Sequence, residues 1–372
     1  MLNKIVIMIS RDALIMRHAS EVRRRIESYG DLFKELHVLV VGGNLGSIQV
    51  IRAGSLKNVV IHYMGKSSIW SLFKAYRKSI NIFNSKKGDS LVVTTQDPFE
   101  TGLVGWLLKK RLGVVWQAQI HTDFNSVFFK KESLKNRVRV LLASFILPLA
   151  DSIRVMSNRI KKSLIEKNNI NKSIIKVLPV WIDFNSKKGI KKIKVADDKF
   201  VILMASRLTK EKNIEMAIKV LGGVARKYMN VLMVIVGEGK EKNNLEKLAA
   251  DLNLKKHIMF EGWQDDLRAY FKRADLYLLT SLYEGYGRTV LEAVYNKVPV
   301  VMTDVGVAGE IIKDRESGRV VPVYNRILLE KALLDLIKDG EARGKYSNEA
   351  FNSLKIMTKN EYLEAFKNSL DL

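Results

Sequence analysis

The chain has 372 residues, enough for two domains of ordinary size, and its 47% hydrophobic and 27% charged residues are typical of a globular protein. It has no cysteine, which excludes disulfides and thiolate metal sites. The net charge is +24, and +18 of it falls within residues 1–180, which contain 30 Lys and Arg against 12 Asp and Glu. This uneven charge indicates an anionic partner for the first half of the chain. The partner could be nucleic acid, an anionic lipid surface or a phosphorylated substrate.

The amino-terminal apolar run is too short for a signal peptide, and Arg11 and Asp12 interrupt it. The longest apolar run elsewhere, 140–150, is too short to cross a bilayer and contains Pro148. We therefore expect a cytoplasmic protein without a membrane span.

Short β-branched runs alternate with longer helical patterns along the first half. The predicted strands are 4–10, 36–41, 58–63, 90–95, 114–119, 152–156 and 174–178, with amphipathic stretches at 17–29, 68–83, 99–112 and 131–149. The second half repeats the scheme with strands at 200–206, 231–237, 257–262, 275–280 and 298–303. Continuous apolar strands separated by helices predict parallel sheets covered on both faces. The predicted fold class is α/β, with two Rossmann-like doubly wound domains facing a cleft.

The domain boundary is predicted within 178–200, where Pro179 ends a strand and a lysine-rich stretch without helical period follows. We expect an N-terminal domain at 1–178, a C-terminal domain at 179–356 and a terminal amphipathic helix within 357–372. Ligands of such sheets bind outside the carboxyl ends of the strands, so functional motifs should directly follow strands.

The segment LYEGYGRTVLEA, residues 282–293, follows the predicted strand 275–280 and leads into a helix. Gly285 and Gly287 allow the backbone to approach a ligand closely. The exposed amides of residues 286–289, with the helix dipole behind them, predict an anion site.

Two carboxylates flank these glycines. Glu284 can accept two hydroxyl hydrogens at once, as a sugar offers them. Glu292 would face the same cleft if the helix begins near Tyr286, and could accept from a ribose diol. The alternative is that Glu284 caps a helix and Glu292 is a solvated helix residue.

The segment 204–219 follows the first strand of the second domain and again leads into a helix. Arg207 and Lys212 lie in one loop, where a guanidinium and an ammonium could both reach a diphosphate. The alternative is that they are ordinary basic loop residues in a chain with 63 Lys and Arg.

His121 follows a strand in the first domain and is followed by Thr122 and Asp123. A histidine at this position can bind a substrate hydroxyl or share charge near a reacting centre, although a lone histidine is more often structural. With five histidines, no cysteine and no Asp-x-Asp pair, the sequence predicts neither a metal site nor another cofactor.

Together these residues resemble the retaining GT-B glycosyltransferases, specifically glycosyltransferase family 4, also termed glycosyltransferase group 1. The resemblance covers nearly the whole chain. The segments that carry it are EGYGRTVLE (284–292), AVYNKVPVVMTDVGVAGEII (293–312), SRLTKEKNI (206–214), VGEGKEKNNLEKLA (236–249) and FEGWQDDLRAYFKRADLYLLTS (260–281).

The resemblance implies a role for each of these positions. It implies that Glu284 binds hydroxyls of the donor sugar and Glu292 the nucleotide ribose, and that Arg207 and Lys212 hold the departing diphosphate. It places His121 beside the donor sugar, and it implies that the C-terminal helix within 357–372 returns to the N-terminal domain. The other implied donor-binding residues are Gly285, Tyr286, Gly287, Arg288 and Thr289 near sugar and phosphate, and Gly262, Trp263 and Gln264 near the base.

The implied activity is transfer of a sugar, with retention, from a nucleoside-diphosphate sugar to a lipid-linked or saccharide acceptor in polysaccharide or glycolipid assembly. The family favours UDP, with GDP as the alternative, and the N-terminal domain holds the acceptor. A departure is the loop after the first strand, residues 10–22, which lacks the glycine pair that the family often has there.

The basic first half suggests an anionic membrane as a further partner, with the protein peripheral on the inner face. Residues 128–150 mix lysines and arginines with apolar residues at a spacing that suits a helix with one basic and one apolar face. The alternative is that the apolar face packs on the sheet and the basic residues are merely solvated.

Two other functions are alternatives to glycosyl transfer. A nucleotide-sugar 2-epimerase of the same fold would need additional acid–base carboxylates, and the sequence offers no clear set. A nucleic-acid-binding protein is suggested by charge alone and would have no use for Glu284 and Glu292. We therefore expect no nucleic-acid partner.

Overall fold

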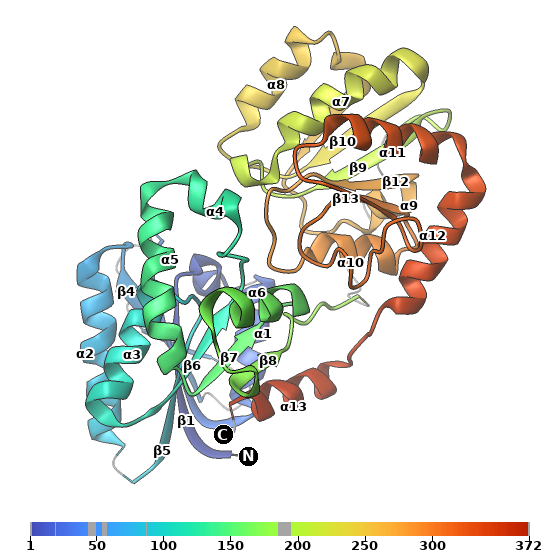
Figure 1. Cartoon of the computed structure of the whole chain (residues 1–372). Helices are drawn as coiled ribbons and strands as arrows, with labels where there is room; N and C mark the ends of the chain where they lie inside the picture. The colour runs from blue at the N-terminus through green and yellow to red at the C-terminus, as the bar shows by residue number, and fades with distance from the viewer. Residues whose placement is uncertain are drawn as a thin grey trace. The chain divides into compact units, whose positions relative to one another are not determined.

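The structure is a computed structural model that describes residues 2–18, 20–43, 50–53, 58–86, 88–184 and 195–370. The chain forms two compact units (Figure 1). The first comprises Met1–Trp181 and Met357–Leu372, and the second comprises Ile182–Ile356. Both are α/β, as predicted, while the facing of the two sheets across a cleft stays a prediction.

The first unit has a sheet in the order β3-β4-β2-β1-β5-β6-β7-β8. Its strands are β1 (Leu2–Ser10), β2 (Phe33–Val41), β3 (Val50–Ala53), β4 (Val59–Gly65), β5 (Ser90–Thr95), β6 (Val115–Ile120), β7 (Ser152–Val155) and β8 (Ile175–Val177). All pair in parallel except β3, which is antiparallel to β4. Strand β3 was not predicted, because a four-residue edge strand of alternating exposure has no continuous apolar run. The strand order reverses between β1 and β5.

Serine side chains determine where several helices of the first unit begin. The helices are α1 (Glu21–Gly30), α2 (Ile69–Ser85), α3 (Glu100–Leu112), α4 (Val127–Glu132), α5 (Leu134–Ile146), α6 (Asn158–Asn168) and α13 (Lys359–Ser369), with 3-10 turns η1 (Ala13–Met16), η2 (Leu147–Leu149) and η3 (Lys172–Ile174). Ser20 caps α1 and Ser133 caps α5 by accepting backbone N–H bonds. The amphipathic stretches at 17–29 and 131–149 both contain helix, but α1 begins only after Ser20, and Ser133 separates α4 from α5.

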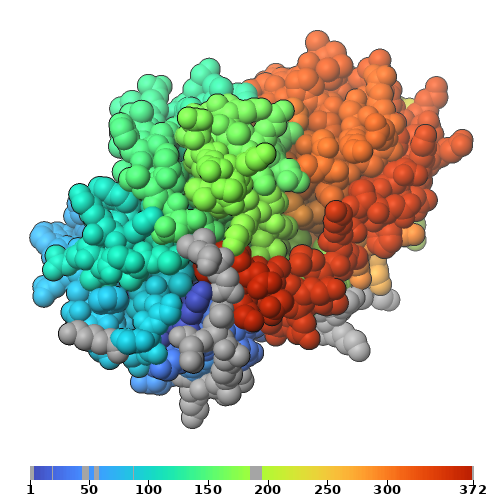
Figure 2. Space-filling view, turned by 60° about the horizontal axis from the view of Figure 1, so that its bottom comes forward, coloured from blue at the N-terminus to red at the C-terminus, as the bar shows by residue number. Residues whose placement is uncertain are grey.

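Helix α13 packs beside α1, and its red atoms lie against green and blue atoms of the first unit in Figure 2. The hydroxyls of Tyr362 and Tyr29 lie 2.9 Å apart, and the rings of Phe366 and Tyr29 stack with centroids 4.2 Å apart. The buried Arg154 of β7 donates to the Tyr362 hydroxyl at 2.8 Å and to the Leu178 carbonyl at 2.8 Å. One guanidinium thus joins the terminal helix to the segment that leaves the first sheet.

Two buried histidines pair on neighbouring strands of the first sheet. His37 Nδ1 and His62 Nε2 lie 3.1 Å apart, and His37 Nε2 lies 2.9 Å from Glu35 Oε2. Burial lowers the pKa of both rings. For His62 the pKa falls to about 3, because the charge of the neighbouring His37 adds to the effect of burial. Both imidazoles are therefore neutral at physiological pH.

We expect acidification to destabilise the first unit through this pair. The folded-state pKa of His62 lies below its ordinary 6.5, so its stabilising effect is present above pH 6.5 and is lost as the pH falls toward 3. From pH 7 to pH 5 the free energy of unfolding should fall by about 2 kcal/mol on account of His62. Urea unfolding at both pH values measures the change. His62→Gln should flatten the dependence, whereas the exposed control His18→Gln should not; an unchanged slope in His62→Gln would contradict the prediction.

The second unit has an all-parallel sheet in the order β11-β10-β9-β12-β13-β14. Its strands are β9 (Phe200–Ala205), β10 (Val231–Val236), β11 (Ile258–Gly262), β12 (Leu276–Leu279), β13 (Val300–Thr303) and β14 (Arg319–Val321). The helices are α7 (Ile214–Lys227), α8 (Lys242–Asp251), α9 (Arg268–Arg273), α10 (Arg288–Tyr295), α11 (Arg326–Lys338) and α12 (Gly340–Ser353), with turns η4 (Lys210–Lys212) and η5 (Lys255–His257). The three-residue strand β14 was not predicted.

Alternate residues of each central strand enter two separate cores. In β9, Ile202 and Met204 pack in the core with α7 and α11, whereas Val201 and Leu203 pack in the core with α9 and α10. Because both faces are covered, the strand is apolar at every position, which is the pattern that predicted a doubly wound sheet. The strand order reverses between β9 and β12, so this point is the expected ligand position.

Candidate functional site

The predicted charged residues of the second unit meet at the carboxyl edge of its sheet. Arg207 and Lys212 follow β9, and Glu284 follows β12. Since β9 and β12 are the neighbours at which the strand order reverses, these side chains flank the switch point.

Lys212 and Glu284 form an ion pair in which Lys212 Nζ donates to Glu284 Oε1. The hydroxyl of Ser281 donates to the same oxygen at 2.8 Å. The two charged side chains are only 13% and 14% exposed, so the pair is shielded from water more than a surface salt bridge. An ammonium has three N–H donors, so Lys212 can hold Glu284 and a ligand oxygen together.

The loops that carry this pair are hydrogen-bonded to each other. The Thr280 hydroxyl donates to the carbonyl oxygens of Lys212 and Asn213, each at 3.0 Å, and the Leu282 amide donates to the Glu211 carbonyl at 2.8 Å. The loops after β9 and β12 therefore form one rigid unit around the ion pair.

The sequence pattern does not single out Tyr277 as a residue of the site, because Tyr277 lies within the apolar strand β12. Its hydroxyl lies 3.2 Å from the Ala205 carbonyl oxygen and donates to Thr289 Oγ1 at 2.6 Å. Burial raises the pKa of Tyr277 well above its usual value, so the hydroxyl stays protonated. It joins the end of β9 to the first turn of α10 and engages Thr289, a predicted donor-binding residue.

Helix α10 begins at Arg288, so the start predicted near Tyr286 is two residues too early. The reason is Gly287, whose φ of +94° is left-handed and outside the helix. The N-cap residue is Gly287 itself, which has no side chain to cap the helix. Glu292 lies in the second turn, where its Oε1 accepts from Arg288 Nε at 2.9 Å.

Arg207 stays outside the shielded pair. Its side chain is 67% exposed and its Nη2 lies 3.1 Å from Glu211 Oε1. Glu211 itself belongs to the same loop as Lys212, so Arg207 is a second, more exposed cation of that loop.

The loop after β10 is pressed against the loop after β9. A Cβ at Gly237 would lie 1.8 Å from the carbonyl oxygen of Ser206, so only glycine fits there. The Gly237 amide donates to the Gly262 carbonyl at 2.7 Å, which brings the end of β11 to the same edge. Beyond it, Trp263 is exposed and donates to Asp265 Oδ1 at 3.1 Å, and Gln264 lies next in the chain.

His121 belongs to the first unit, where it follows β6. Its Nε2 lies 3.3 Å from Gln119 Oε1. Burial is the main cause that lowers the pKa of His121 to about 3, and the positive charges of Arg154 and Arg25 lower it further. The ring is therefore neutral at physiological pH. Its predicted position beside the donor sugar stays a prediction.

The glycine-poor loop after β1 holds an arginine between two elements. Arg11 Nη1 lies 3.0 Å from Glu100 Oε2, and Arg11 Nη2 donates to Ser67 Oγ at 2.8 Å. Asp12 caps the turn η1 by accepting from the Leu14 amide at 2.9 Å. Polar side chains thus organise this loop in place of a glycine pair.

Within the described ranges, no three His, Cys, Asp or Glu side chains gather as a metal ion would need. The same ranges contain no helix with the length and apolarity to span a bilayer. The metal-free site stays a prediction.

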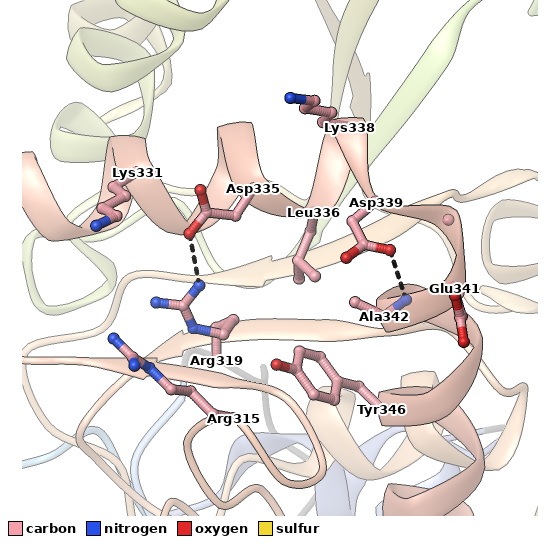
Figure 3. A pocket seen from close by; sticks show the side chains of 11 residues that line it. Arg315, Arg319, Lys331, Asp335, Leu336, Lys338, Asp339, Glu341, Ala342 and Tyr346 are labelled. Atoms are coloured by element: carbon pink, nitrogen blue, oxygen red, sulfur yellow. Dashed lines mark hydrogen bonds and ion pairs between the residues drawn. The ribbon is translucent and has the colours of Figure 1, made fainter.

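A cavity of about 820 Å³ lies elsewhere on the second unit (Figure 3). Arg319 lines it and pairs with Asp335 at 3.1 Å and with Asp314 at 3.2 Å. Arg319 is the first residue of β14, so this cavity lies at the amino edge of the parallel sheet, opposite the edge that carries Lys212 and Glu284. It is therefore separate from the candidate site.

Sequence comparison agrees with this arrangement. Residues 185–353, which include the whole carboxyl edge just described, match the family described as "Glycosyl transferases group 1". The chain carries a group 1 glycosyltransferase domain. The domain contains Arg207, Lys212, Glu284 and Glu292, while His121 lies outside the matched residues.

The matches to some curated relatives extend beyond the glycosyltransferase domain into the first unit. One is the N-acetylgalactosamine-N,N'-diacetylbacillosaminyl-diphospho-undecaprenol 4-alpha-N-acetylgalactosaminyltransferase of Campylobacter jejuni, 29% identical over 63% of this chain and 64% of its own. Another is the UDP-Gal:alpha-D-GlcNAc-diphosphoundecaprenol alpha-1,3-galactosyltransferase of Escherichia coli, 26% identical over 72% of each chain. The chain spans less than two thirds of the length of the first curated relatives that it matches.

Solved structures share the architecture of both units. The Anabaena protein HepE in complex with UDP-glucose has a TM-score of 0.70 and 17% identity, over 99% of this chain and 98% of that one. At this identity the likeness shows the fold alone, which is the two-domain α/β fold GT-B that the resemblance implied.

Proposed function

We propose that this protein is a retaining glycosyltransferase that moves a sugar from a nucleoside-diphosphate sugar to a lipid-linked or saccharide acceptor in polysaccharide or glycolipid assembly. The observation that carries the proposal is the shielded pair of Lys212 and Glu284 at the switch point of the second sheet. It combines a cation for a diphosphate with a carboxylate for sugar hydroxyls, and Glu284 precedes the first residue of helix α10 by four positions in the chain.

In the proposed reaction, the bond between the anomeric carbon and the diphosphate oxygen breaks, and a bond from an acceptor hydroxyl oxygen forms on the same face. The acceptor proton leaves with the departing diphosphate. Negative charge grows on that diphosphate, and Lys212, Arg207 and the first amides of α10 would stabilise it without a metal ion. Glu284 would hold the sugar hydroxyls so that the anomeric carbon stays in reach of the acceptor.

The base and the acceptor are proposed from the relatives. The E. coli relative names UDP-Gal, and the HepE structure contains UDP-glucose, which supports UDP, with GDP as the alternative. Both relatives name a diphosphoundecaprenol acceptor. A lipid-linked acceptor supports our proposal that the protein works as a peripheral protein at the inner face of a membrane, through its basic first unit.

We expect a nucleoside diphosphate to stabilise the protein in a thermal-shift experiment with UDP, GDP, ADP and their sugars. A ligand at 100 times its Kd adds about 2.7 kcal/mol, which should raise the Tm by about 5 °C or more. EDTA should leave this shift unchanged, because the charges that hold the diphosphate belong to Lys212 and Arg207. No shift with any of these compounds, or a shift that EDTA abolishes, would contradict the proposal.

A further inference from the structure

Helix α5 of the first unit has two apolar faces, and only one of them is covered. Val140, Ala143 and Ile146 are buried, together with Asn136, and they face the rest of the unit. The opposite face carries four exposed apolar side chains, which we call the α5 stripe: Leu134, Val138, Leu141 and Phe145, exposed by 74%, 64%, 62% and 78%.

The α5 stripe is continuous along the helix. Its members follow one another at intervals of four, three and four residues, which places them on one face over three turns. A surface helix normally has polar residues on its outward face, so a row of four apolar residues there marks an interaction site. The alternative, in which the apolar face of 128–150 packs on the sheet, therefore does not hold for these four residues.

Basic residues flank the stripe. Lys135 and Arg137 are exposed and lie on either side of it, and Lys131 is exposed on α4, just before α5 begins. The basic face is smaller than the sequence suggested, because Arg139 is bound to Glu100 by Nε at 3.0 Å and Nη2 at 2.7 Å. Lys135 Nζ lies 3.6 Å from the same carboxylate, but its side chain stays 64% exposed. The arrangement is an apolar face bordered by cations.

Further apolar residues lie on the same side of the sheet. Ile69 and Trp70, in the first turn of α2, are 78% and 72% exposed. Helix α3 contacts both α2 and α5, so the three helices cover one side of the first sheet side by side (Figure 1). Tryptophan is enriched where an apolar medium meets water.

We propose that the α5 stripe is a membrane-docking surface, which lies in the interface of an anionic phospholipid bilayer with Lys135 and Arg137 on the headgroups. Charge decides between the occupants. A second copy of this chain would bring an equally basic first unit against the first, whereas an anionic leaflet neutralises it. A single apolar row with flanking cations also matches the helices that lie flat in a bilayer surface. This docking surface rests on the membrane association that is part of the proposed function. It does not depend on the proposed transfer of a sugar.

The test is flotation of the full chain with vesicles of phosphatidylglycerol and phosphatidylcholine. Wild-type protein should float with mixed vesicles, and less with pure phosphatidylcholine or at high salt. The double variant Leu141→Ser/Phe145→Ser should lower the partition coefficient at least tenfold, and Arg137→Glu at least fivefold. The matched control is Met229→Ser/Ile327→Ser, which removes two apolar residues of the second unit that are at least as exposed, at 81% each, and should stay within twofold of wild type.

Two outcomes overturn the proposal: wild-type protein that does not float, and a Leu141→Ser/Phe145→Ser variant that floats like wild type. Sedimentation velocity without lipid tests whether a second copy of the chain covers the α5 stripe instead. A wild-type dimer that becomes a monomer in the double variant, with no flotation of the wild-type protein, would also overturn the membrane proposal. The UDP-induced thermal shift of the same variants is independent of the membrane. Flotation without any nucleotide shift would refute the proposed function and leave the docking surface, and the reverse result would refute only the docking surface.

Discussion

The variant Glu284→Gln should lose glycosyl transfer by about 10²- to 10⁴-fold in kcat/KM while it still binds the nucleotide. The carboxylate is proposed to accept two sugar hydroxyls, and each hydrogen bond to a charged group contributes about 1.5–3 kcal/mol. An amide keeps the size of the side chain and its oxygen can still accept from Ser281 and Lys212, so the fold should stay intact. Initial-rate kinetics and calorimetric titration with UDP measure the two effects.

Glu316→Gln is the matched control for this variant, because Glu316 belongs to the same unit and its side chain is 70% exposed in a surface pair with Lys313. Its kcat/KM should equal that of wild type. If Glu284→Gln keeps full activity, Glu284 is only a structural partner of Lys212, and the proposed sugar contact is wrong.

The variant Lys212→Met should lower kcat by about 10²–10³-fold, since it removes one preorganised positive charge from the departing diphosphate. It should weaken UDP binding as well, because the diphosphate is charged before and after transfer. Methionine is unbranched and fills a similar volume, so the loops joined by Thr280 should keep their positions.

Lys210→Met is the control for the loss of a lysine, because Lys210 lies in the same short turn as Lys212 and points to solvent. It should leave kcat and UDP affinity unchanged. The double variant Lys212→Met/Glu284→Gln should be no worse than the worse single variant if the pair acts as one unit. A kcat of Lys212→Met within threefold of wild type would exclude Lys212 from the chemistry.

The sequence predicted the parts of the fold that depend on hydrophobic patterning. Strands such as β9 are apolar at every position because both faces are buried, and this pattern is readable without a structure. The short strands β3 and β14 carry no such pattern, since they have only four and three residues and lie at the edges of their sheets. Serine caps such as Ser133 divide a continuous helical period that the residue pattern alone does not divide.

The candidate site was predictable as a set of residues and not as a set of contacts. Glycines and charges that follow strands predicted Lys212 and Glu284 at one sheet edge. The ion pair itself, and its support by Ser281 and Tyr277, depend on the register of β9 and β12, which no local pattern reveals. Likewise, the packing of α5 against the rest of the first unit determines which of its apolar residues stay exposed, and the residue pattern alone does not reveal this.

The return of α13 to the first unit affects the order in which the protein can mature on the ribosome. Tyr29 and Arg154 emerge early during synthesis, but Tyr362 and Phe366, which cover them, emerge only after the whole second unit. The first unit therefore leaves the exit tunnel with an open apolar side and completes its folding last, although it is made first. Premature termination before residue 357 would expose that side to chaperones and proteases, which ensures that only a fully translated chain yields a finished first unit.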